Sequence, residues 1–493
     1  MKLTFQQSKV HSIKADVLAV FVHQDPRLFR QEIADLKRRL GAHIPAADSG
    51  DFKGKDGEST VVYLDRKAAS PRLLVVGLGE RRKLSLEKYR RAAASAAKRA
   101  RSLRAKIVGM LLPVVDGRAA NIIAAFAEGA QLSLYRFDKY ITKKEDDTQP
   151  VEEITFYVER TGLVGIGAKS VQTAQIASEA TCLARDLVNA PGNELYPESL
   201  ADAARQSAER WGYSVTVLDE RELKDLGMGG VVAVSQGSEH PPRFIILEYG
   251  QSSKKPVVLV GKGVTFDTGG ISIKPSANMA EMKMDMSGAA AVIGAFEAVA
   301  RLKLPVHIVG LIPAVENMPS GHAIRPGDIL RHYNGKTSEV DNTDAEGRLI
   351  LADALAYAEK YKPSAVVDLA TLTGACVVAL GHYATGMMGN DEQLMKSLKD
   401  AGEATYERVW PLPMFEEYEK LIKSDIADVK NVGGRWAGAI TGAWFLKKFI
   451  GKYRWVHLDI AGTAILEEHS DYTPKGGSGV GVRLLTEFLK RWK

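Results

Sequence analysis

The sequence predicts an α/β protein with two domains: a smaller N-terminal α/β domain and a C-terminal domain whose mainly parallel central sheet is covered by helices on both faces. Three observations lead to this fold class. The chain has 493 residues, more than most single domains. Apolar runs of strand length alternate with helical segments. Residues 1–160 hold 30 Lys and Arg against 20 Asp and Glu, whereas the rest of the chain holds 36 against 40, so the two parts differ in charge.

The first elements lie in the N-terminal part. The apolar runs Leu73–Gly79 and Ile107–Val115 predict buried strands. Between them, the stretch Leu84–Lys106 is rich in Ala, Arg and Lys and predicts a helix. This order of strand, helix and strand is typical of α/β folds.

Two later stretches indicate loops and mark the domain boundary. Lys143–Glu153 is strongly charged and contains a proline, and Asn189–Pro197 contains two prolines and a glycine. A helical segment lies between them. We therefore expect an N-terminal domain at 1–160, a connecting helix at 161–190 and a C-terminal domain at 191–493.

The C-terminal part alternates strands and helices throughout. Continuous apolar strands separated by helices are typical of a parallel sheet that is buried on both faces. The expected strands are Phe244–Glu248, Val257–Phe266, Val306–Val315, Ala365–Leu372 and Val456–Gly462. The expected helices are Gly288–Leu302, Arg348–Lys360, Thr441–Phe449 and Gly481–Trp492.

Composition excludes several classes of protein. The two cysteines, Cys182 and Cys376, are far apart, which argues against a disulfide scaffold and against a cysteine zinc site. The apolar run Val17–Val22 is too short for a signal peptide, and the sequence has no run of about 18 apolar residues that would span a membrane. We expect a cytoplasmic protein with no membrane partner.

Charged residues cluster where expected strands end and helices begin. Lys262, Asp267 and Lys274 follow the apolar run Val257–Val260, and Asp285 precedes a helix start. The stretch "NTDAEGRL" adds three more: Asp344, Glu346 and Arg348. Open α/β sheets place their sites in the loops beyond the carboxyl ends of strands. Four acids on one rim repel each other unless two divalent cations neutralise them, and carboxylates suit Mg, Mn or Zn.

Each of these residues also has a structural interpretation. Thr343–Glu346 matches a capping box, which taken alone is the better interpretation of that segment. Asp267 could be a turn aspartate, and Asp285 could be an acid favoured by a helix N-terminus. The lysines could be solvated. The coincidence of all these residues at strand-to-helix transitions, among glycines that permit close approach of the backbone, favours a site.

Other motifs for common enzyme sites are absent from the sequence. It has no H-E-x-x-H, no P-loop and no G-x-S-x-G nucleophile elbow. "VGLGE" at Val76–Glu80 lacks the third glycine of a dinucleotide-binding fingerprint.

The segment "NTDAEGRL" resembles the signature of the leucyl (cytosol) aminopeptidases, the M17 family of metallopeptidases. The surrounding blocks "VGKGVTFDTGGISIKP", "MKMDMSGAAAV", "DLATLTGAC", "GGRWAGAITGAWFL" and "HLDIAGTA" resemble the family in the same order. The resemblance is dense from about Thr181 to Arg483 and weak in residues 1–160.

The resemblance implies a hydrolase with two divalent metals, manganese or zinc. The tighter metal would be bound by Lys262, Asp267, Asp285 and Glu346, and the more exchangeable metal by Asp267, Asp344 and Glu346. Lys274 would stabilise the oxyanion, and Arg348 would hold a bicarbonate that acts as general base. The positions that match the substrate pocket are Met282, Asn342, Thr371, Leu372 and Gly374.

The resemblance further implies peptide substrates with a free N-terminus and a homo-hexamer. Two other interpretations stay open. The stretch Arg81–Lys106 has eleven basic residues against Glu87 alone, which could bind a nucleic acid, although a solvated helix face is favoured. The third interpretation is a structural hexamer without activity, against which the intact ligand set argues.

Overall fold

The structure is a computed structural model that describes residues 1–113, 117–142, 149–250 and 255–492. Its contacts divide the chain into two compact units. Unit 1 comprises Met1–Glu179 and Glu468–Pro474, and unit 2 comprises Ala180–Glu467 and Lys475–Lys493. The loop expected at 143–153 falls partly, at 143–148, outside the described residues.

Unit 1 is built on a six-stranded sheet in the order β1-β6-β5-β2-β4-β3. All pairs are parallel except β3 with β4. The strands are β1 (Lys2–Gln7), β2 (Val17–Val22), β3 (Ser59–Tyr63), β4 (Arg72–Gly77), β5 (Ile107–Leu111) and β6 (Glu153–Val158). The helices are η1 (Val10–Ser12), α1 (Pro26–Leu40), α2 (Pro45–Ser49), η2 (Arg81–Lys83), α3 (Leu86–Ser102) and α4 (Ala119–Ser133), and α5 (Val164–Asn189) runs from unit 1 into unit 2.

A short segment from near the end of the chain, residues 468–474, is part of unit 1. Tyr472 is buried there, and its hydroxyl donates a hydrogen bond to Glu87 of α3 over 2.9 Å. Asp471 forms an ion pair with Arg91, also on α3, at 3.2 Å. The core of unit 1 is therefore completed by residues that follow most of unit 2 in the sequence.

The basic stretch Arg81–Lys106 is less free to bind an anion than its sequence indicates. At least six of its eleven basic side chains have a carboxylate partner: Arg82, Lys83, Lys88, Arg90, Arg91 and Lys106. These pairs reduce the charge that a phosphate backbone would meet. Nucleic-acid binding stays a prediction, and the paired side chains favour a structural role for this helix.

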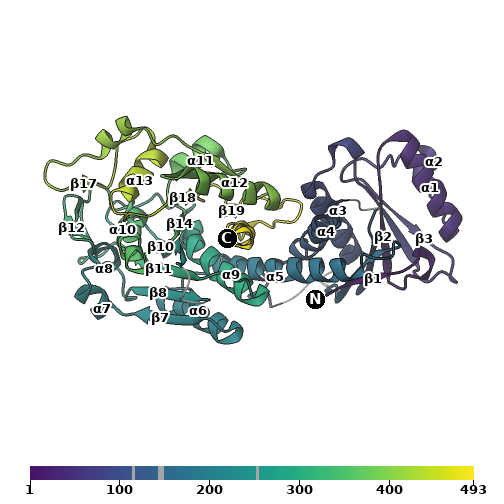
Figure 1. The fold of residues 1–493 in the computed structure, drawn as a ribbon, viewed down its shortest axis with the longest axis horizontal. Coiled ribbons are helices and arrows are strands. Elements are labelled where there is room, and N and C mark those ends of the chain that lie inside the picture. Colours follow the sequence, from purple (N-terminus) through teal and green to yellow (C-terminus); the bar gives the residue numbers. More distant parts are fainter. Residues whose placement is uncertain (114–116, 143–148, 251–254, 493) are drawn as a thin grey trace. The chain divides into compact units, whose positions relative to one another are not determined.

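Unit 2 contains a nine-stranded, mainly parallel sheet in the order β16-β15-β18-β14-β9-β11-β8-β7, with β10 paired to β11 (Figure 1). The strands are β7 (Ser214–Leu218), β8 (Arg243–Tyr249), β9 (Val257–Gly261), β10 (Gly263–Asp267), β11 (Ile308–Asn317), β14 (Ala365–Ala370), β15 (Thr385–Gly389), β16 (Val409–Pro411) and β18 (Trp455–Asp459).

Helices and two small sheets surround this core. The helices are α6 (Pro197–Trp211), α7 (Glu220–Asp225), α8 (Gly229–Ser235), η4 (Met279–Met286), α9 (Ser287–Leu302), α10 (Glu346–Ala358), η5 (Glu359–Tyr361), α11 (Gly374–Leu380), α12 (Glu392–Thr405), η6 (Glu416–Ile422), α13 (Gly438–Lys447) and α14 (Val482–Arg491). The small sheets contain β12 (Ile329–Arg331), β13 (Thr337–Glu339) and β17 (Val429–Lys430), and β19 (Ile465–Leu466) with β20 (Gly476–Gly477). None of the described helices combines the length and apolarity needed to span a membrane.

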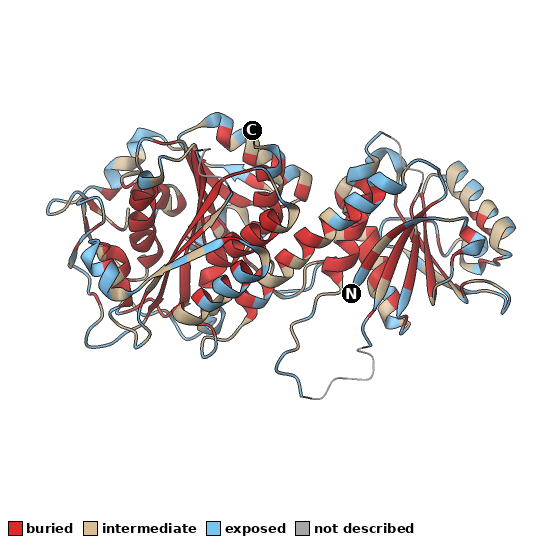
Figure 2. Ribbon diagram, turned by 60° about the horizontal axis from the view of Figure 1, so that its bottom comes forward, coloured by how far each residue is buried: buried red, intermediate tan, exposed pale blue. Residues whose placement is uncertain are grey.

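Helices cover both faces of the central sheet, as the apolar runs predicted. Val258 and Val260 of β9 belong to one buried cluster with residues of α10 and α13. Gly310 of β11 faces the other way: a Cβ there would lie 3.1 Å from Val292 of α9. Alternate residues of a strand point to opposite faces, so α9 and α10 lie on opposite sides. Figure 2 shows the strands of both units as mostly buried.

The single strand expected at 257–266 is wrong in one respect, because the structure divides it at Lys262 into β9 and β10. β9 pairs with β14 and β11, whereas β10 continues along β11 alone and contains a register shift between Val264 and Phe266. At the break, the side chain of Lys262 turns towards buried carboxylates. The break in the strand thus places the Lys262 side chain beside Asp285 and Glu346.

Close packing at the start of α9 gives a stability prediction. A Cβ at Gly288 would lie 2.1 Å from the carbonyl oxygen of Leu369 in β14. We expect Gly288→Ala to destabilise unit 2 by about 1–3 kcal/mol, since the backbone must move. Gly321→Ala is the matched control, because its Cβ would meet nothing within 4 Å. Thermal unfolding of both variants checks this, and equal Tm values would contradict it.

Candidate metal centre

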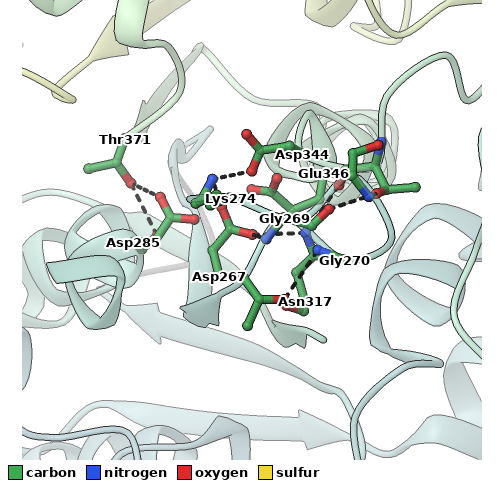
Figure 3. A network of polar contacts seen from close by, with 12 residues as sticks. Asp267, Gly269, Gly270, Lys274, Asp285, Asn317, Asp344, Glu346 and Thr371 are labelled. Atoms are coloured by element: carbon green, nitrogen blue, oxygen red, sulfur yellow. Dashed lines mark hydrogen bonds and ion pairs between the residues drawn. The ribbon is translucent and has the colours of Figure 1, made fainter. Parts of the chain in front are cut away.

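The carboxyl ends of neighbouring strands bring the predicted site residues together. Lys262 follows β9, Asp267 ends β10, and Thr371 follows β14. β9 and β14 run parallel with Leu369 opposite Gly261, so their ends meet at one edge of the sheet. Asp344 and Glu346 reach the same place from the loop before α10 and from the first residue of that helix. The predicted rim of charged residues is therefore confirmed as a spatial cluster (Figure 3).

Lys262 lies at the buried end of this cluster. Its ammonium donates to Asp285 Oδ1 and to the carbonyl of Thr371, each at 2.8 Å, and pairs with Glu346 Oε1 at 2.9 Å. A Cβ at Gly347 would lie 2.7 Å from the Lys262 Nζ, so this glycine makes room for the lysine. The side chain of Lys262 is thus held by two carboxylates and one backbone carbonyl.

Lys274 lies at the more open end. Its Nζ pairs with Asp267 Oδ2 at 2.7 Å and also contacts Asp344. The other oxygen of Asp267 accepts hydrogen bonds from the Asn317 amide at 2.8 Å and from the backbone N–H of Gly269 at 2.9 Å. Figure 3 shows Asp267 between Lys274 and these donors. Asp267 is therefore fixed from three directions.

The acids are arranged as a cation site requires. Asp267, Asp344 and Glu346 each offer a carboxylate oxygen, and these oxygens lie within 4.8 Å of one another. Asp285 is next to them and accepts a hydrogen bond of 2.6 Å from the Thr371 hydroxyl. Among the described residues, Asp285 Oδ2 and Glu346 Oε2 are buried without a hydrogen-bond partner. Buried charged oxygens without partners are costly, and divalent cations satisfy them. The donor set fits divalent metals.

Burial and mutual repulsion shift the pKa values of these acids. Burial, with the nearby Glu346, raises the pKa of Asp267 to about 6. Burial likewise raises the pKa values of Asp285 and Asp344. Burial alone would raise the pKa of Glu346 as well, but Lys262 and Lys274 bring it below its ordinary value. Without a cation beside them, Asp267, Asp285 and Asp344 therefore ionise less readily than ordinary carboxylic acids.

The lysines respond in the opposite direction. Burial opposes the charged form of Lys262, but Asp285, Glu346 and Asp267 together raise its pKa. Burial also opposes the charge of Lys274, whose pKa is raised by Asp267 and Glu346. Both lysines are therefore ammonium ions when no metal is present, and they partly neutralise the four acids.

Arg348 lies on the first turn of α10 beside this cluster. It is 7% exposed, and its Nη1 donates to the carbonyl oxygen of Asn431 over 2.6 Å. Its Nε is buried without a partner among the described residues. Burial lowers the pKa of Arg348 to about 10, so the guanidinium stays charged at neutral pH. A buried guanidinium with a free N–H can bind a small planar anion.

The predicted substrate residues lie in three segments around the acids. Asn342 accepts a hydrogen bond of 2.8 Å from the Asp344 N–H. Thr371 contacts both Asp285 and Lys262. The backbone N–H of Leu372 donates to Asp459 at 3.2 Å, and Gly374 is the exposed first residue of α11. Met282 lies in η4, partly exposed, three residues before Asp285.

The capping-box interpretation of Thr343–Glu346 is wrong. The helix α10 begins at Glu346, and its N-cap residue, Ala345, makes no side-chain cap. The Thr343 hydroxyl instead donates to the carbonyl of Gly269 over 2.6 Å and accepts from the N–H of Ser272. Thr343 thereby ties the segment that carries Asp344 to the loop after β10.

Sequence reasoning missed Asn317, the last residue of β11. Besides its bond to Asp267, its amide donates to the carbonyl oxygen of Thr343 over 3.1 Å. Its position could have indicated this role, because Asn317 follows the expected strand Val306–Val315 by two residues. The rule that strand ends carry site residues applies to it as well.

Comparisons with known proteins identify one family along most of the chain. The catalytic domain of the cytosol aminopeptidase family matches residues 182–486, and the N-terminal domain of that family matches residues 18–144. A probable cytosol aminopeptidase of Geobacter sp. (strain M21) is 48% identical, covering 98% of this chain and 97% of the relative. One of Chlorobaculum parvum is 46% identical, with both chains covered completely.

Solved structures show the same similarity. The structure of the bottromycin maturation enzyme BotP in complex with Mn is 37% identical in sequence and has a TM-score of 0.85. The match covers 97% of this chain and 99% of the BotP chain. The structure of a mutant of tomato leucine aminopeptidase is 34% identical in sequence and has a TM-score of 0.87. The match covers 100% of this chain and 97% of the tomato chain.

The raised pKa of Asp267 predicts how pH controls metal binding. A cation needs the ionised carboxylate, whereas Asp267 takes up a proton below about pH 6. The affinity for Mn²⁺ should therefore fall as pH decreases from about 7 to about 5, by about tenfold per pH unit for each proton displaced. Titration of the metal-free protein with Mn²⁺, with free Mn²⁺ followed by electron paramagnetic resonance, measures this. A constant affinity over that range would contradict the expectation.

Proposed function

Since this chain belongs to the cytosol aminopeptidase family and is a peptidase, we propose that it is a two-metal aminopeptidase that releases leucine and other N-terminal amino acids from peptides. The observation that carries the proposal is the close set of acids Asp267, Asp344 and Glu346, with Asp285 and Lys262 beside them. Two of these acids, Asp285 and Glu346, have buried oxygens without a hydrogen-bond partner in the part of the chain that the structure describes.

The proposed ligands divide between two cations, manganese or zinc. Lys262, Asp267, Asp285 and Glu346 would hold the tighter ion, and Asp267, Asp344 and Glu346 the more exchangeable one. When bound, the cations would polarise the scissile carbonyl, lower the pKa of a water molecule and take the free α-amine of the substrate. The exposure of Asp344, the least buried of the four acids, supports its place at the exchangeable ion.

The protein's own residues supply the remaining chemistry. Lys262 must lose its proton to act as a ligand, so metal loading would release that proton. Lys274 would exchange its pairs with Asp267 and Asp344 for the developing oxyanion, which an ammonium group stabilises by its positive charge. The free N–H of Arg348 supports its role as the clamp for a bicarbonate, which would supply a general base that the four acids cannot.

The surroundings of the acids would select the substrate. Asn342, Thr371, Leu372, Gly374 and Met282 are proposed to line the pocket for the N-terminal residue. Thr371 is anchored by Asp285, and Leu372 by Asp459, so the pocket wall and the metal centre share contacts. We further propose a cytoplasmic homo-hexamer, as the family resemblance implies.

Chelation followed by metal addition tests the proposal. The protein should hydrolyse leucine p-nitroanilide, lose this activity to a chelator, and regain it with Mn²⁺ or Zn²⁺. It should not cleave the N-acetylated substrate, which lacks the free α-amine. Glu346→Ala should stay inactive with every metal, because it removes an acid shared by both ions. A wild-type protein that stays inactive with Mn²⁺, Zn²⁺ and Mg²⁺ would refute the proposal.

The anion clamp has its own test. Arg348→Ala should lower kcat by about a hundredfold, the contribution typical of general base catalysis, and abolish any stimulation by bicarbonate. Metal content should stay that of the wild type. Arg325→Ala is the control, since Arg325 is exposed and its guanidinium pairs with nearby Asp328. A bicarbonate response that persists in Arg348→Ala would count against the clamp.

A further inference from the structure

The side chain of Asn431 spans the segment that carries two of the proposed ligands. Asn431 follows β17 and is fully buried. Its Oδ1 accepts hydrogen bonds from the backbone N–H groups of Asp341, at 2.7 Å, and Asn342, at 3.2 Å. Its Nδ2 donates to the carbonyl oxygens of Asn342, at 2.7 Å, and Ala345, at 3.4 Å. One amide thus holds both ends of the segment 341–345.

These four bonds use the whole capacity of the amide. An asparagine side chain can accept two hydrogen bonds and donate two. All four partners of Asn431 are backbone groups of one short segment, and Asp344 projects from the middle of it. Glu346 follows Ala345 directly and opens α10. The spacing of Asp344 and Glu346 is therefore fixed through the backbone between them.

The main-chain groups of Asn431 form two further hydrogen bonds. Its N–H donates to the carbonyl of Glu339 in β13 over 2.9 Å, which anchors the residue to the small sheet. Its carbonyl accepts the bond from Arg348 Nη1 at 2.6 Å. A side-chain substitution leaves both main-chain groups in place. A substitution can therefore remove the side-chain bonds to the segment 341–345 and keep the main-chain bonds.

We infer that Asn431 is a positioning residue of the metal centre, which sets the geometry of Asp344 relative to Glu346 without touching the metal. The inference rests on the proposed function, because it assigns the segment 341–345 to the ligand set. Asp344 serves only the more exchangeable ion in that set. Loss of the Asn431 amide should therefore weaken that ion more than the tighter one.

Mn²⁺ titration of the full-length protein tests the inference. In Asn431→Ala, the weaker of two Mn²⁺ ions should bind about tenfold less tightly or worse, as is typical when a residue that orients a ligand is lost. The tighter ion should change less. The kcat at subsaturating Mn²⁺ should fall and should recover at high Mn²⁺ while the tighter ion keeps its affinity, a combination that a general loss of stability would not produce.

A second variant separates position from charge. Asn431→Asp keeps an acceptor for the two N–H groups, loses both donor bonds, and adds a negative charge that by Coulomb attraction would tighten cation binding. Weaker Mn²⁺ binding in this variant as well would show that position decides. Asn390→Asp is the matched control: its amide also donates to a backbone carbonyl, of Tyr453, and accepts a backbone N–H, of Trp455.

The outcomes are distinguishable. If wild-type protein binds neither Mn²⁺ nor Zn²⁺, the proposed function fails, whatever the variants do. If wild-type protein binds two ions and both Asn431 variants bind them within about twofold of wild type, the inference is overturned. The same holds if Asn390→Asp weakens Mn²⁺ binding as much as the Asn431 variants. If Asn431→Ala does not fold, Asn431→Asp alone decides between these results.

Discussion

Four carboxylates at one edge of a sheet repel one another, and the structure of unit 2 is arranged around their neutralisation. Lys262 and Lys274 each reach between two acids, so the metal-free site already contains counter-charge. Burial keeps the pKa values of Asp267, Asp285 and Asp344 raised despite these two ammonium groups. Divalent cations fit such a set of buried acids.

The fold supplies the precision that such a site needs. Parallel pairing of β9 with β14 aligns Lys262 with Thr371, and the break in the strand lets the lysine turn inwards. Backbone atoms approach closely only where glycines leave room, as Gly347 does beside Lys262. Hydrogen bonds from Asn317 and Thr343 then join the two loops that carry Asp267 and Asp344. Strand pairing and buried hydrogen bonds thus hold the segments that carry the acids in place.

The sequence predicted the cluster of acids and lysines well because these residues occur in dense local motifs at the ends of apolar runs. It predicted less where contacts are distant. Asn431 lies 90 residues from Asp341, and no local pattern links the two. Thr343 shows the opposite error: its local pattern matches a helix cap, but a tertiary bond to Gly269 takes its hydroxyl. The strands that the sequence predicted are present in the structure. The break at Lys262 was not predicted, because the acids that its side chain meets, Asp285 and Glu346, lie far along the chain.

The return of residues 468–474 to unit 1 has a consequence for biosynthesis. The ribosome completes the first 179 residues long before it makes Tyr472, whose hydroxyl contacts Glu87. At roughly 5–20 residues per second, the nascent N-terminal unit waits on the order of tens of seconds with that buried position unfilled. Unit 1 can therefore complete its packing around Tyr472 only after nearly all of unit 2 has been synthesised. A chain truncated before this segment would leave Glu87 without its tyrosine.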